Sequence, residues 1–407
     1  MTPSHRALSG VRVLDFSLMI AGPYGARLLA DLGADVIKIE SPDGDDMRLR
    51  PPLQADEEGA AHSRYFGQLN AGKRSLVLDL KHPEAITLVR RLVSEADVLL
   101  ENFRPGVMQR LGLGCETLRA LNPRLVYCSI SGYGQTGPAA ERAAYAMIVQ
   151  AASGYERTLA RYAGDRTRPA ATATFVADLL GGLYAFSAIQ TALLQRERTG
   201  VGQQLDVALM DSMLNLLVYE LQEAQGQAPL PRPTYGPVAA ADGDVLIVPI
   251  TTRNFDALRE VTQLPELFAD PRFTTPSARA THWAAMMEVV ERWTRDHPAT
   301  EVLRRLEAAG VPCARYNEPA DALNDPVLVE RGAFSRVEDA AGTFLGVNAP
   351  WRMSGSATSI GARVPTVGEH SSQVLAEVLG LADGEIETLR AAGVFGPSTA
   401  GTQPPSR

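Results

Sequence analysis

The chain has 407 residues, of which 45% are hydrophobic and 21% are charged, an ordinary composition for a soluble globular protein. This length predicts two domains rather than a single core. The formal net charge of −8 argues against a nucleic-acid-binding protein, which needs a basic face. The sequence also shows no signal-peptide pattern and no apolar run of about 18 residues, the length of a membrane-spanning helix. We therefore expect a cytoplasmic protein that binds neither nucleic acid nor membrane.

The three cysteines, Cys115, Cys128 and Cys313, are isolated from one another in the sequence. Their spacing predicts neither a disulfide framework nor a metal site. We expect no metal and no permanently bound cofactor.

The chain opens with an apolar run over 11–16, a helical pattern over 24–32 that ends at Gly33, and a second apolar run over 35–40. This order predicts a βαβ unit and hence a parallel sheet. The loop after the first strand has a GxxG spacing, whereas dinucleotide-binding loops have GxGxxG. We expect a Rossmann-like sheet that binds neither nicotinamide nor flavin.

Three further strands are predicted over 75–79, 98–102 and 125–131, with a helix over 83–95 and a polar loop over 41–68. The loops after these strands are rich in glycine, arginine, asparagine and aromatic residues. Any one of them could be only a turn. Because the carboxyl ends of parallel strands meet at one edge of a sheet, together they indicate a phosphate- and adenine-bearing ligand.

The stretch from Thr172 to Asp211 carries the candidate catalytic group. Asp178 follows a β-branched and aromatic run over 174–176, predicted as a strand, and opens a helical pattern that ends at 199–200. Gly181 and Gly182 fall in the first turn, where the absence of side chains would leave room for a ligand. By spacing alone, Asp178 is most simply a helix N-cap, which contributes about 1 kcal/mol.

The second half of the sequence contains the expected boundaries between the two domains. We expect the large domain to begin with residues 1–225, a proline-rich linker over 226–237, a smaller α/β domain over 238–331, a return to the large domain over 332–395 and a disordered tail over 396–407. The smaller domain should contain a strand over 245–250 and helices over 255–261, 282–294 and 300–309. Strands over 334–353 and helices over 371–379 and 383–392 should complete the large domain.

Seven motifs in fixed order resemble those of the family III CoA-transferases, which include formyl-CoA transferase and carnitine CoA-transferase and are related to α-methylacyl-CoA racemase. They are LSGVRVLDFSLMIAGPYGARLLADLGADVIKIESPDGDDMR, LNAGKRSLVLDLKHPE, ADVLLENFRPGVMQRLGLG, NPRLVYCSISGYGQTGP, FVADLLGG, RTGVGQQLDVALMDSML and RGAF. The resemblance covers about Leu8 to Phe395. It implies a Rossmann-like large domain built from both chain ends, a smaller inserted domain and an interlocked homodimer.

The resemblance also implies roles for particular residues. The catalytic aspartate corresponds to Asp178, which would form an anhydride and then a thioester with coenzyme A. Moving CoA between acids in this way conserves the energy of the thioester. The substrates would be an acyl-CoA, for example succinyl-CoA, and a small carboxylic acid. The CoA-binding positions correspond to Leu78, Lys81, Asn102, Phe103, Arg104, Arg110 and Met210.

We assign the acyl pocket to Met19, Ile20 and Tyr145, and the stabilisation of oxyanions to backbone N–H groups of Gly181 and Gly182. Three positions depart from the pattern of formyl-CoA transferase. Ile20 replaces a glutamine, Ser41 replaces an arginine for which Arg48 could substitute, and a tetraglycine loop has no counterpart over 235–242. These departures favour an acid that is bulkier or more apolar than formate or oxalate.

Two alternatives remain open. In the racemases a histidine stands at the position of Tyr145 and an aspartate at that of Ala146. Because a tyrosine with its ordinary pKa near 10 is a poor base at neutral pH, transfer is favoured over racemisation. A non-catalytic acyl-CoA-binding protein is the other alternative.

Overall fold

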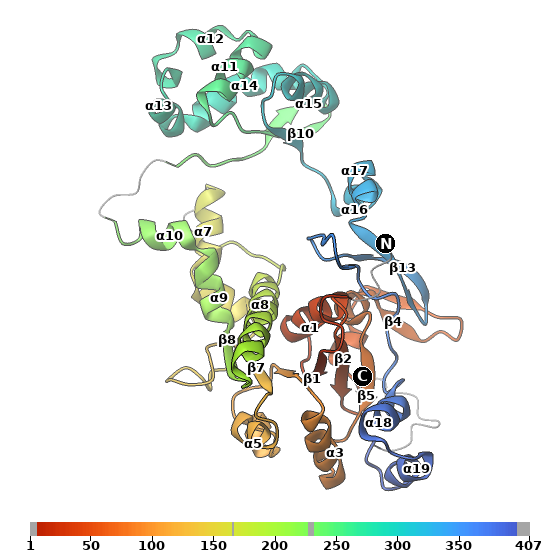
Figure 1. The fold of residues 1–407 in the computed structure, drawn as a ribbon. Coiled ribbons are helices and arrows are strands. Elements are labelled where there is room, and N and C mark those ends of the chain that lie inside the picture. Colours follow the sequence, from red (N-terminus) through yellow and green to blue (C-terminus); the bar gives the residue numbers. More distant parts are fainter. Residues whose placement is uncertain (1–5, 165–166, 227–231, 397–407) are drawn as a thin grey trace. The chain divides into compact units, whose positions relative to one another are not determined.

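The computed structural model describes residues 6–164, 167–226 and 232–396 (Figure 1). The chain divides into two compact units, one formed by Met1–Val218 with Val329–Arg407 and the other by Tyr219–Leu328. The division thus falls before the expected linker over 226–237 and three residues before the expected end of the smaller domain at 331. Residues 227–231 of that linker and 397–407 of the expected tail lie outside the described residues.

The first unit is built on a six-stranded sheet in the order β5-β2-β1-β6-β7-β8. All neighbouring strands are parallel. The strands are β1 (Arg12–Asp15), β2 (Asp35–Glu40), β5 (Arg74–Val77), β6 (Val98–Glu101), β7 (Val126–Ser131) and β8 (Gln204–Ala208). This is the strand order of a Rossmann fold, in which the order reverses beside the first strand. The predicted α/β fold with a parallel sheet is confirmed.

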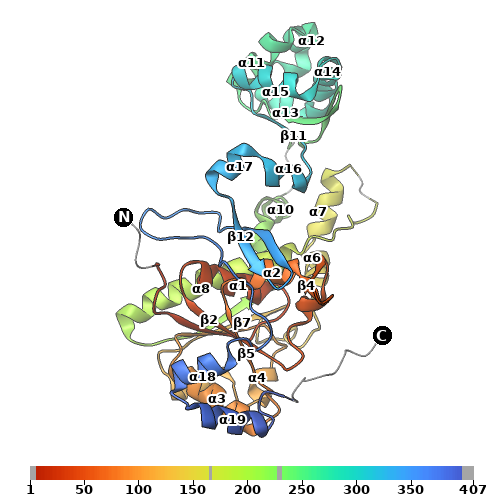
Figure 2. The same ribbon diagram turned by 90° about the vertical axis from the view of Figure 1, so that its right-hand side faces the viewer.

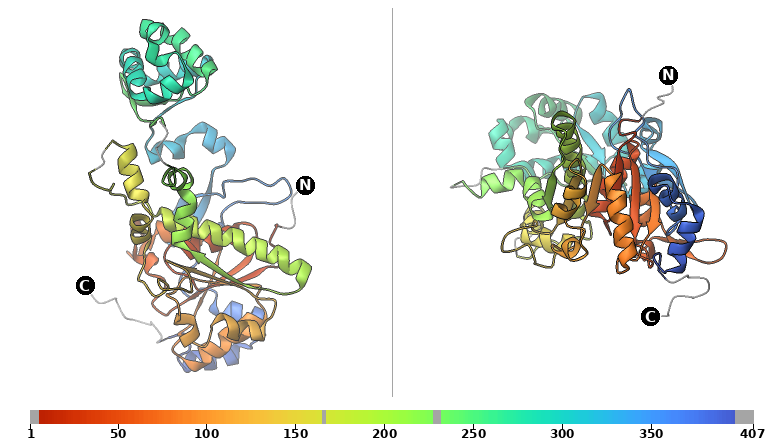
Figure 3. Two further views of the ribbon diagram at one scale, coloured as in Figure 1. Left: turned by 90° about the vertical axis from the view of Figure 1, so that its left-hand side faces the viewer. Right: turned by 60° about the horizontal axis from the view of Figure 1, so that its bottom comes forward.

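Helices cover both faces of the sheet (Figure 2). Alternate strand residues point to opposite faces, so Val13 packs on the side of α1 (Ala21–Asp31) and α8 (Val176–Thr199). Its neighbour Leu14 packs on the side of α3 (Pro83–Ser94), α18 (Ser371–Leu379) and α19 (Asp383–Ala391). The left panel of Figure 3 shows α8 lying along its face of the sheet. The C-terminal helices thus complete the layer that α3 begins.

Helices α1 and α8 approach each other closely through glycine. A Cβ atom on Gly25 would lie 2.8 Å from the carbonyl oxygen of Gly182, and one on Gly182 would lie 2.4 Å from the carbonyl oxygen of Ala21. Both distances are too short for a carbon–oxygen contact. The backbones of the two helices therefore touch where any larger residue would separate them.

Two predictions of secondary structure are wrong. Helix α8 begins at Val176, so residues 174–176 form no strand and Asp178 is the third residue of the helix rather than its N-cap. The polar loop over 41–68 contains regular structure: η1 (Asp46–Leu49), β3 (Leu53–Ala55), β4 (Ala61–Ser63) and the start of α2 (Arg64–Asn70). The strands expected over 334–353 are present in the first unit as β12 (Phe334–Asp339) and β13 (Gly342–Val347), which pair with each other.

The remaining helices of the first unit are short. They are α4 (Val107–Arg110), α5 (Cys115–Leu121), α6 (Ala146–Ala152), α7 (Tyr155–Tyr162) and α9 (Leu209–Leu216). None of α4 to α7 was expected, because segments of four to eight residues carry little periodic signal. They fill the connections between β6, β7 and α8.

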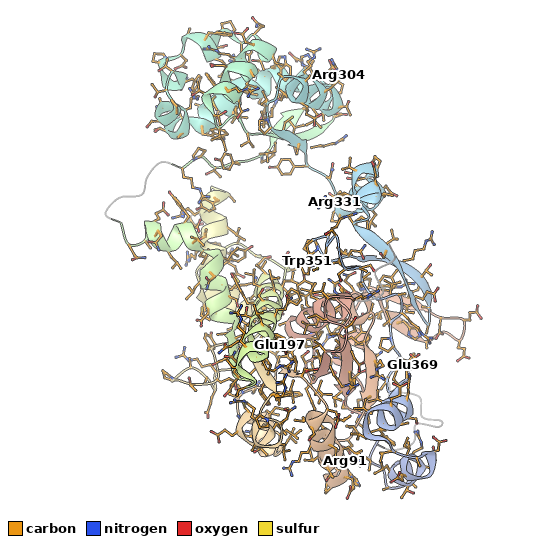
Figure 4. All side chains as sticks on the ribbon, viewed as in Figure 1. Arg91, Glu197, Arg304, Arg331, Trp351 and Glu369 are labelled. Carbon is orange, nitrogen blue, oxygen red and sulfur yellow. The ribbon has the colours of Figure 1, made fainter. Side chains whose placement is uncertain are left out.

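The second unit has its own hydrophobic core, which includes Phe255, Trp283 and Trp293. Its antiparallel sheet has the order β11-β10-β9. The strands of this sheet are β9 (Val238–Ala240), β10 (Gly243–Ile247) and β11 (Cys313–Arg315). The helices are α10 (Val218–Glu223), α11 (Thr252–Thr262), α12 (Pro265–Ala269), η2 (Pro271–Phe273), α13 (Pro276–Thr281), α14 (Trp283–Arg295), α15 (Ala299–Ala308), α16 (Pro319–Asn324) and α17 (Pro326–Arg331). Helices α10 and α17 cross the boundaries between the two units. Figure 4 shows Arg304 on α15 at the surface of this unit.

The glycine contact between α1 and α8 predicts a large cost for a single methyl group. Gly182→Ala should lower the free energy of unfolding by about 1 to 3 kcal/mol, because the new Cβ meets backbone atoms that cannot move aside. Chemical denaturation of the first unit measures this change. Gly384→Ala is the matched control, since a Cβ there meets nothing within 4 Å and the residue lies in α19. Equal stability of the two variants would contradict the proposed constraint.

Candidate active site

A cavity of about 600 Å³ lies in the first unit and is lined by residues that follow β1 and β6. These are the two strands between which the strand order reverses, the usual ligand site of such sheets. The structure brings together six of the predicted site residues there: Met19, Ile20, Asn102, Arg104, Tyr145 and Asp178. Most of the solvent-accessible surface of this cavity is apolar.

Asp178 lies in the first turn of α8. The start of this helix is held by Gln150, a buried residue of α6, whose side-chain oxygen accepts a hydrogen bond from the Ala177 N–H at 3.3 Å. Burial raises the pKa of Asp178 to about 6. No ion pair is described for this carboxylate. At neutral pH it is therefore ionised but poorly solvated, which makes it more nucleophilic than an exposed aspartate.

The loop after β1 is held by two side chains from elsewhere in the chain, those of Asn102 and Asp45. Asn102 accepts a hydrogen bond from the Leu18 N–H and donates one to the Leu18 carbonyl, both at 2.8 Å. Asp45 accepts from the Met19 N–H at 3.3 Å, and Met19 has a φ of 65°, in the left-handed region that non-glycine residues rarely adopt. These bonds hold Met19 and Ile20 at the cavity wall. The Asn102 amide is thus engaged with the loop.

Two buried ion pairs lie beneath this loop. Lys73 contacts Asp15 at 2.8 Å, and Lys38 contacts Asp45 at 2.9 Å, with all four side chains inaccessible to solvent. Lys38 also donates to the Ser17 carbonyl at 2.7 Å. Although burial alone would raise the pKa of Asp15, the charges of Lys73 and Lys38 lower it. The ionised network therefore fixes both ends of the loop.

The structure places Gly181 and Gly182, the residues assigned to oxyanion stabilisation, away from the cavity lining. Both are buried inside α8 and do not line the cavity. A Cβ on Gly181 would lie 2.4 Å from a methyl carbon of Leu209, and Gly182 faces α1. Their N–H groups follow the first turn of the helix and are engaged in its hydrogen bonds. They serve close packing and cannot form an oxyanion hole.

The other predicted CoA-binding residues lie outside the cavity. Leu78 is wholly buried in the core beneath α3, and Lys81 is exposed in the loop before that helix. Phe103 and Met210 are half-buried, Phe103 against that core and Met210 against the core on the α8 side. Arg110 lines a second cavity, of about 560 Å³, together with Gln135 and other residues after β6 and β7.

Sequence reasoning missed Arg50 and Tyr65, which line the first cavity. Burial and then the negative charge of Asp178 raise the pKa of the Tyr65 hydroxyl, so the two groups lie close enough to interact. Both residues belong to the segment expected to be a polar loop. The sequence contained part of the signal for helix α2, because serine is a typical helix N-cap residue. In the structure Ser63 caps α2 and its side chain accepts a hydrogen bond from the Phe66 N–H. Arg48, considered as a substitute for the family arginine, instead pairs with Glu40 and lies outside this cavity.

The sequence is similar to a known enzyme family. The pattern of CoA-transferase family III matches residues 8–371. Succinate–glutarate CoA-transferase of Agrobacterium fabrum is 37% identical, over 91% of this chain and 95% of the relative. Formyl-CoA:oxalate CoA-transferase of Streptomyces avermitilis is 34% identical, over 96% of this chain and 100% of the relative.

A solved structure agrees with these matches. The crystal structure of a CAIB/BAIF family protein from Brucella suis has a TM-score of 0.81 and 37% sequence identity, and the alignment covers 92% of this chain and 100% of the other. In the part of the chain that the structure describes, no group of three histidine, cysteine or acidic residues is arranged to hold a metal.

The raised pKa of Asp178 predicts that this residue destabilises the fold. Because folding raises the pKa from 3.8 to about 6, the ionised carboxylate is disfavoured in the native state. The penalty is absent below about pH 4, grows as the pH rises to about 6 and is complete above it. Asp178→Asn should therefore raise the free energy of unfolding by about 1 to 3 kcal/mol near pH 8 and by little near pH 4.

Denaturation of both proteins across this pH range measures the difference. Asp211→Asn is a suitable control, because Asp211 is an exposed carboxylate in the first turn of α9. An Asp178→Asn effect that is independent of pH would show that the carboxylate is ordinarily solvated.

Proposed function

Because the chain belongs to CoA-transferase family III, we propose that it moves CoA from an acyl-CoA donor, such as succinyl-CoA, to a free carboxylic acid through covalent intermediates on Asp178. The observation that carries this proposal is an ionised but poorly solvated carboxylate facing a largely apolar cavity. Such a carboxylate can attack a thioester, and an apolar cavity limits hydrolysis of the product.

The reaction needs four displacements. The Asp178 carboxylate attacks the thioester carbonyl carbon, the carbon–sulfur bond breaks, and an anhydride and CoA thiolate form. The thiolate then attacks the Asp178 carbonyl carbon, which releases the donor acid and leaves an aspartyl-CoA thioester. The acceptor carboxylate attacks this thioester to give a second anhydride and thiolate. Attack of the thiolate on the acceptor's acyl carbon forms the new acyl-CoA and restores Asp178.

The groups around Asp178 suit these steps. Ala21, the first residue of α1, and Asp178, in the first turn of α8, both line the cavity, so we assign the positive ends of the two helix dipoles to stabilisation of the developing oxyanions. Tyr65 lines the same cavity, and we assign its hydroxyl as a further hydrogen-bond donor to these oxyanions. These groups replace Gly181 and Gly182 in the role first assigned to those glycines.

We place CoA along the loops after β6 and β7. Arg104 lines the first cavity and Arg110 the second, so a chain of cations follows the path from the thioester to the phosphates. Phe103, the residue before Arg104, offers an apolar face to the pantetheine arm or adenine. The half-buried Met210 and the exposed Lys81 belong to the same proposal, whereas the buried Leu78 can contribute only through its backbone.

We propose that the active protein is an interlocked homodimer. Support comes from the uncovered apolar face of α8, where Leu179, Leu183, Tyr184 and Leu194 are each between 37% and 57% exposed. This helix is long and apolar enough to span a membrane by length and composition alone. Its other face is buried in the core of the first unit through Ala185 and Ile189, which favours a second protein chain as the occupant of the exposed face.

The nucleophile assignment predicts loss of activity on removal of one carboxylate. Asp178→Ala should lower the rate of CoA transfer by about a thousandfold or more, because no other carboxylate lines the cavity among the described residues. Mass spectrometry after hydroxylamine treatment should find a hydroxamate on Asp178 only when donor is present. Gly384→Ala should leave the rate unchanged. Transfer by Asp178→Ala at the normal rate would refute the mechanism, and α-proton exchange in a 2-methylacyl-CoA would favour a racemase.

The pKa of Asp178 predicts the acid limb of the pH profile. Since the ionised form attacks the donor, kcat/KM for the acyl-CoA should rise with pH and level off above about 6. Rates measured with succinyl-CoA and with acetyl-CoA should share this limb, because it belongs to the free enzyme. A limb centred near pH 4, the range of an ordinary aspartate, would contradict the proposed environment.

A further inference from the structure

Arg50 is a cation that the proposed mechanism leaves without a role. Its side chain lines the first cavity and is exposed to solvent. Among the described residues no carboxylate or carbonyl is recorded as its side chain's partner. Because an arginine fork binds a carboxylate with two parallel hydrogen bonds, an unpaired arginine in a cavity is a specific site for a carboxylate ligand.

The neighbouring Arg48 shows what a structural arginine looks like in the same segment. Arg48 forms two hydrogen bonds of 2.8 Å with Glu40, donates to the Pro365 carbonyl and stacks over Phe66 at 3.9 Å. Its donors are therefore occupied by the fold. Arg50, two residues later, makes none of these contacts.

The backbone of Arg50 is nevertheless held in place. Its N–H donates to the Met47 carbonyl at 3.2 Å, and its carbonyl accepts from the Ser63 hydroxyl at 2.6 Å. Ser63 also caps α2, the helix that carries Tyr65. Arg50 is thus tied to the same support as a residue that interacts with Asp178. The backbone from which the Arg50 side chain extends into the cavity is therefore fixed relative to α2.

Arg50 does not neutralise Asp178. Burial is the only influence on the pKa of Asp178, and burial raises this pKa. An arginine in close contact with Asp178 would lower the pKa instead. The guanidinium is therefore separated from the nucleophile within one cavity. A substrate with one carboxylate at the reacting end and a second carboxylate at the far end would match these two groups.

The direction of the substrate follows from the other cations. The arginines assigned to CoA, Arg104 and Arg110, come from the segment after β6, whereas Arg50 comes from the segment after β2. Strands β2 and β6 flank β1 on opposite sides. With CoA on the β6 side, Arg50 remains for the acyl group. Met47 and Pro51, which also line the cavity, provide apolar surface for the carbon chain between two carboxylates.

We infer that Arg50 binds the distal carboxylate of a dicarboxylic acid and of its CoA thioester, and thereby selects dicarboxylic over monocarboxylic substrates. The inference rests on the proposed CoA transfer at Asp178. It assigns the substrate class, and it makes Arg50 the residue that sets specificity.

The test compares substrates that differ by a single charged group. Glutarate and valerate serve as acceptors with acetyl-CoA as donor, so that the donor itself has no distal carboxylate. Arg50→Met should lower kcat/KM for glutarate by about tenfold to a hundredfold, chiefly through KM. It should leave valerate, and the exchange of labelled acetate into acetyl-CoA, within about twofold. Arg50→Lys keeps the positive charge but loses the two parallel hydrogen bonds of the guanidinium. Its kcat/KM for glutarate should lie between those of the unmodified protein and of Arg50→Met.

Two further comparisons make the result specific. Succinyl-CoA and butyryl-CoA form the same pair on the donor side, and only succinyl-CoA should be affected by Arg50→Met. Arg304→Met removes an arginine that is exposed on α15 of the second unit and should change neither pair (Figure 4).

The possible failures are distinct. Equal use of glutarate and valerate by the unmodified protein, or an equal loss of both in Arg50→Met, would overturn the role of Arg50 and leave CoA transfer intact. Absence of exchange with any acid, labelled acetate included, would overturn the proposed function and this inference with it.

Discussion

The contact between α1 and α8 determines where the reactive carboxylate lies. Gly25 and Gly182 let the two helix backbones meet, and Asp178 precedes Gly182 by four residues, about one helical turn. The carboxylate consequently lines the same cavity as Ile20 and Ala21, at the start of α1. A position fixed by backbone packing is more rigid than one fixed by side chains, because backbone atoms have no alternative rotamers. The helix dipoles of α1 and α8 meet at the cavity for the same reason.

A second constraint acts on the loop that carries Met19 into the cavity. Met19 adopts a left-handed conformation, which persists only where the surroundings enforce it. Here they do so through the buried pairs Lys38–Asp45 and Lys73–Asp15. Burying four charges costs desolvation energy that a hydrophobic core would not. The network nevertheless supplies what an apolar core cannot, namely directional hydrogen bonds to the carbonyl of Ser17 and the N–H of Met19.

The sequence predicted the parts of the fold in which hydrophobic pattern and turn residues agree. The strand over 35–40 matches β2 at both ends, and α3, α18 and α19 lie within one residue of their expected limits. Family resemblance supplied Asp178, Asn102 and Arg104 in the cavity. Pattern failed at the start of α8, where the β-branched and aromatic run over 174–176 read as a strand. The sequence pattern also gave the wrong role for Gly182. A glycine that leaves room for a ligand and a glycine that lets a neighbouring helix approach cannot be told apart from the sequence.

The least predictable segment contains the residues assigned to substrate choice. Residues 41–68 fold into a 3-10 turn, a short hairpin and the start of a helix, none long enough to carry a periodic pattern. Arg48 and Arg50 lie two residues apart and have opposite surroundings, one engaged by Glu40 and the other facing the cavity. No local rule distinguishes them, because the difference depends on β2 and α2, which approach from elsewhere in the chain. The nucleophile lies on a long helix held by its neighbours, and the proposed selector lies on an irregular segment. Substrate preference can therefore change through this segment while the geometry around Asp178 is preserved.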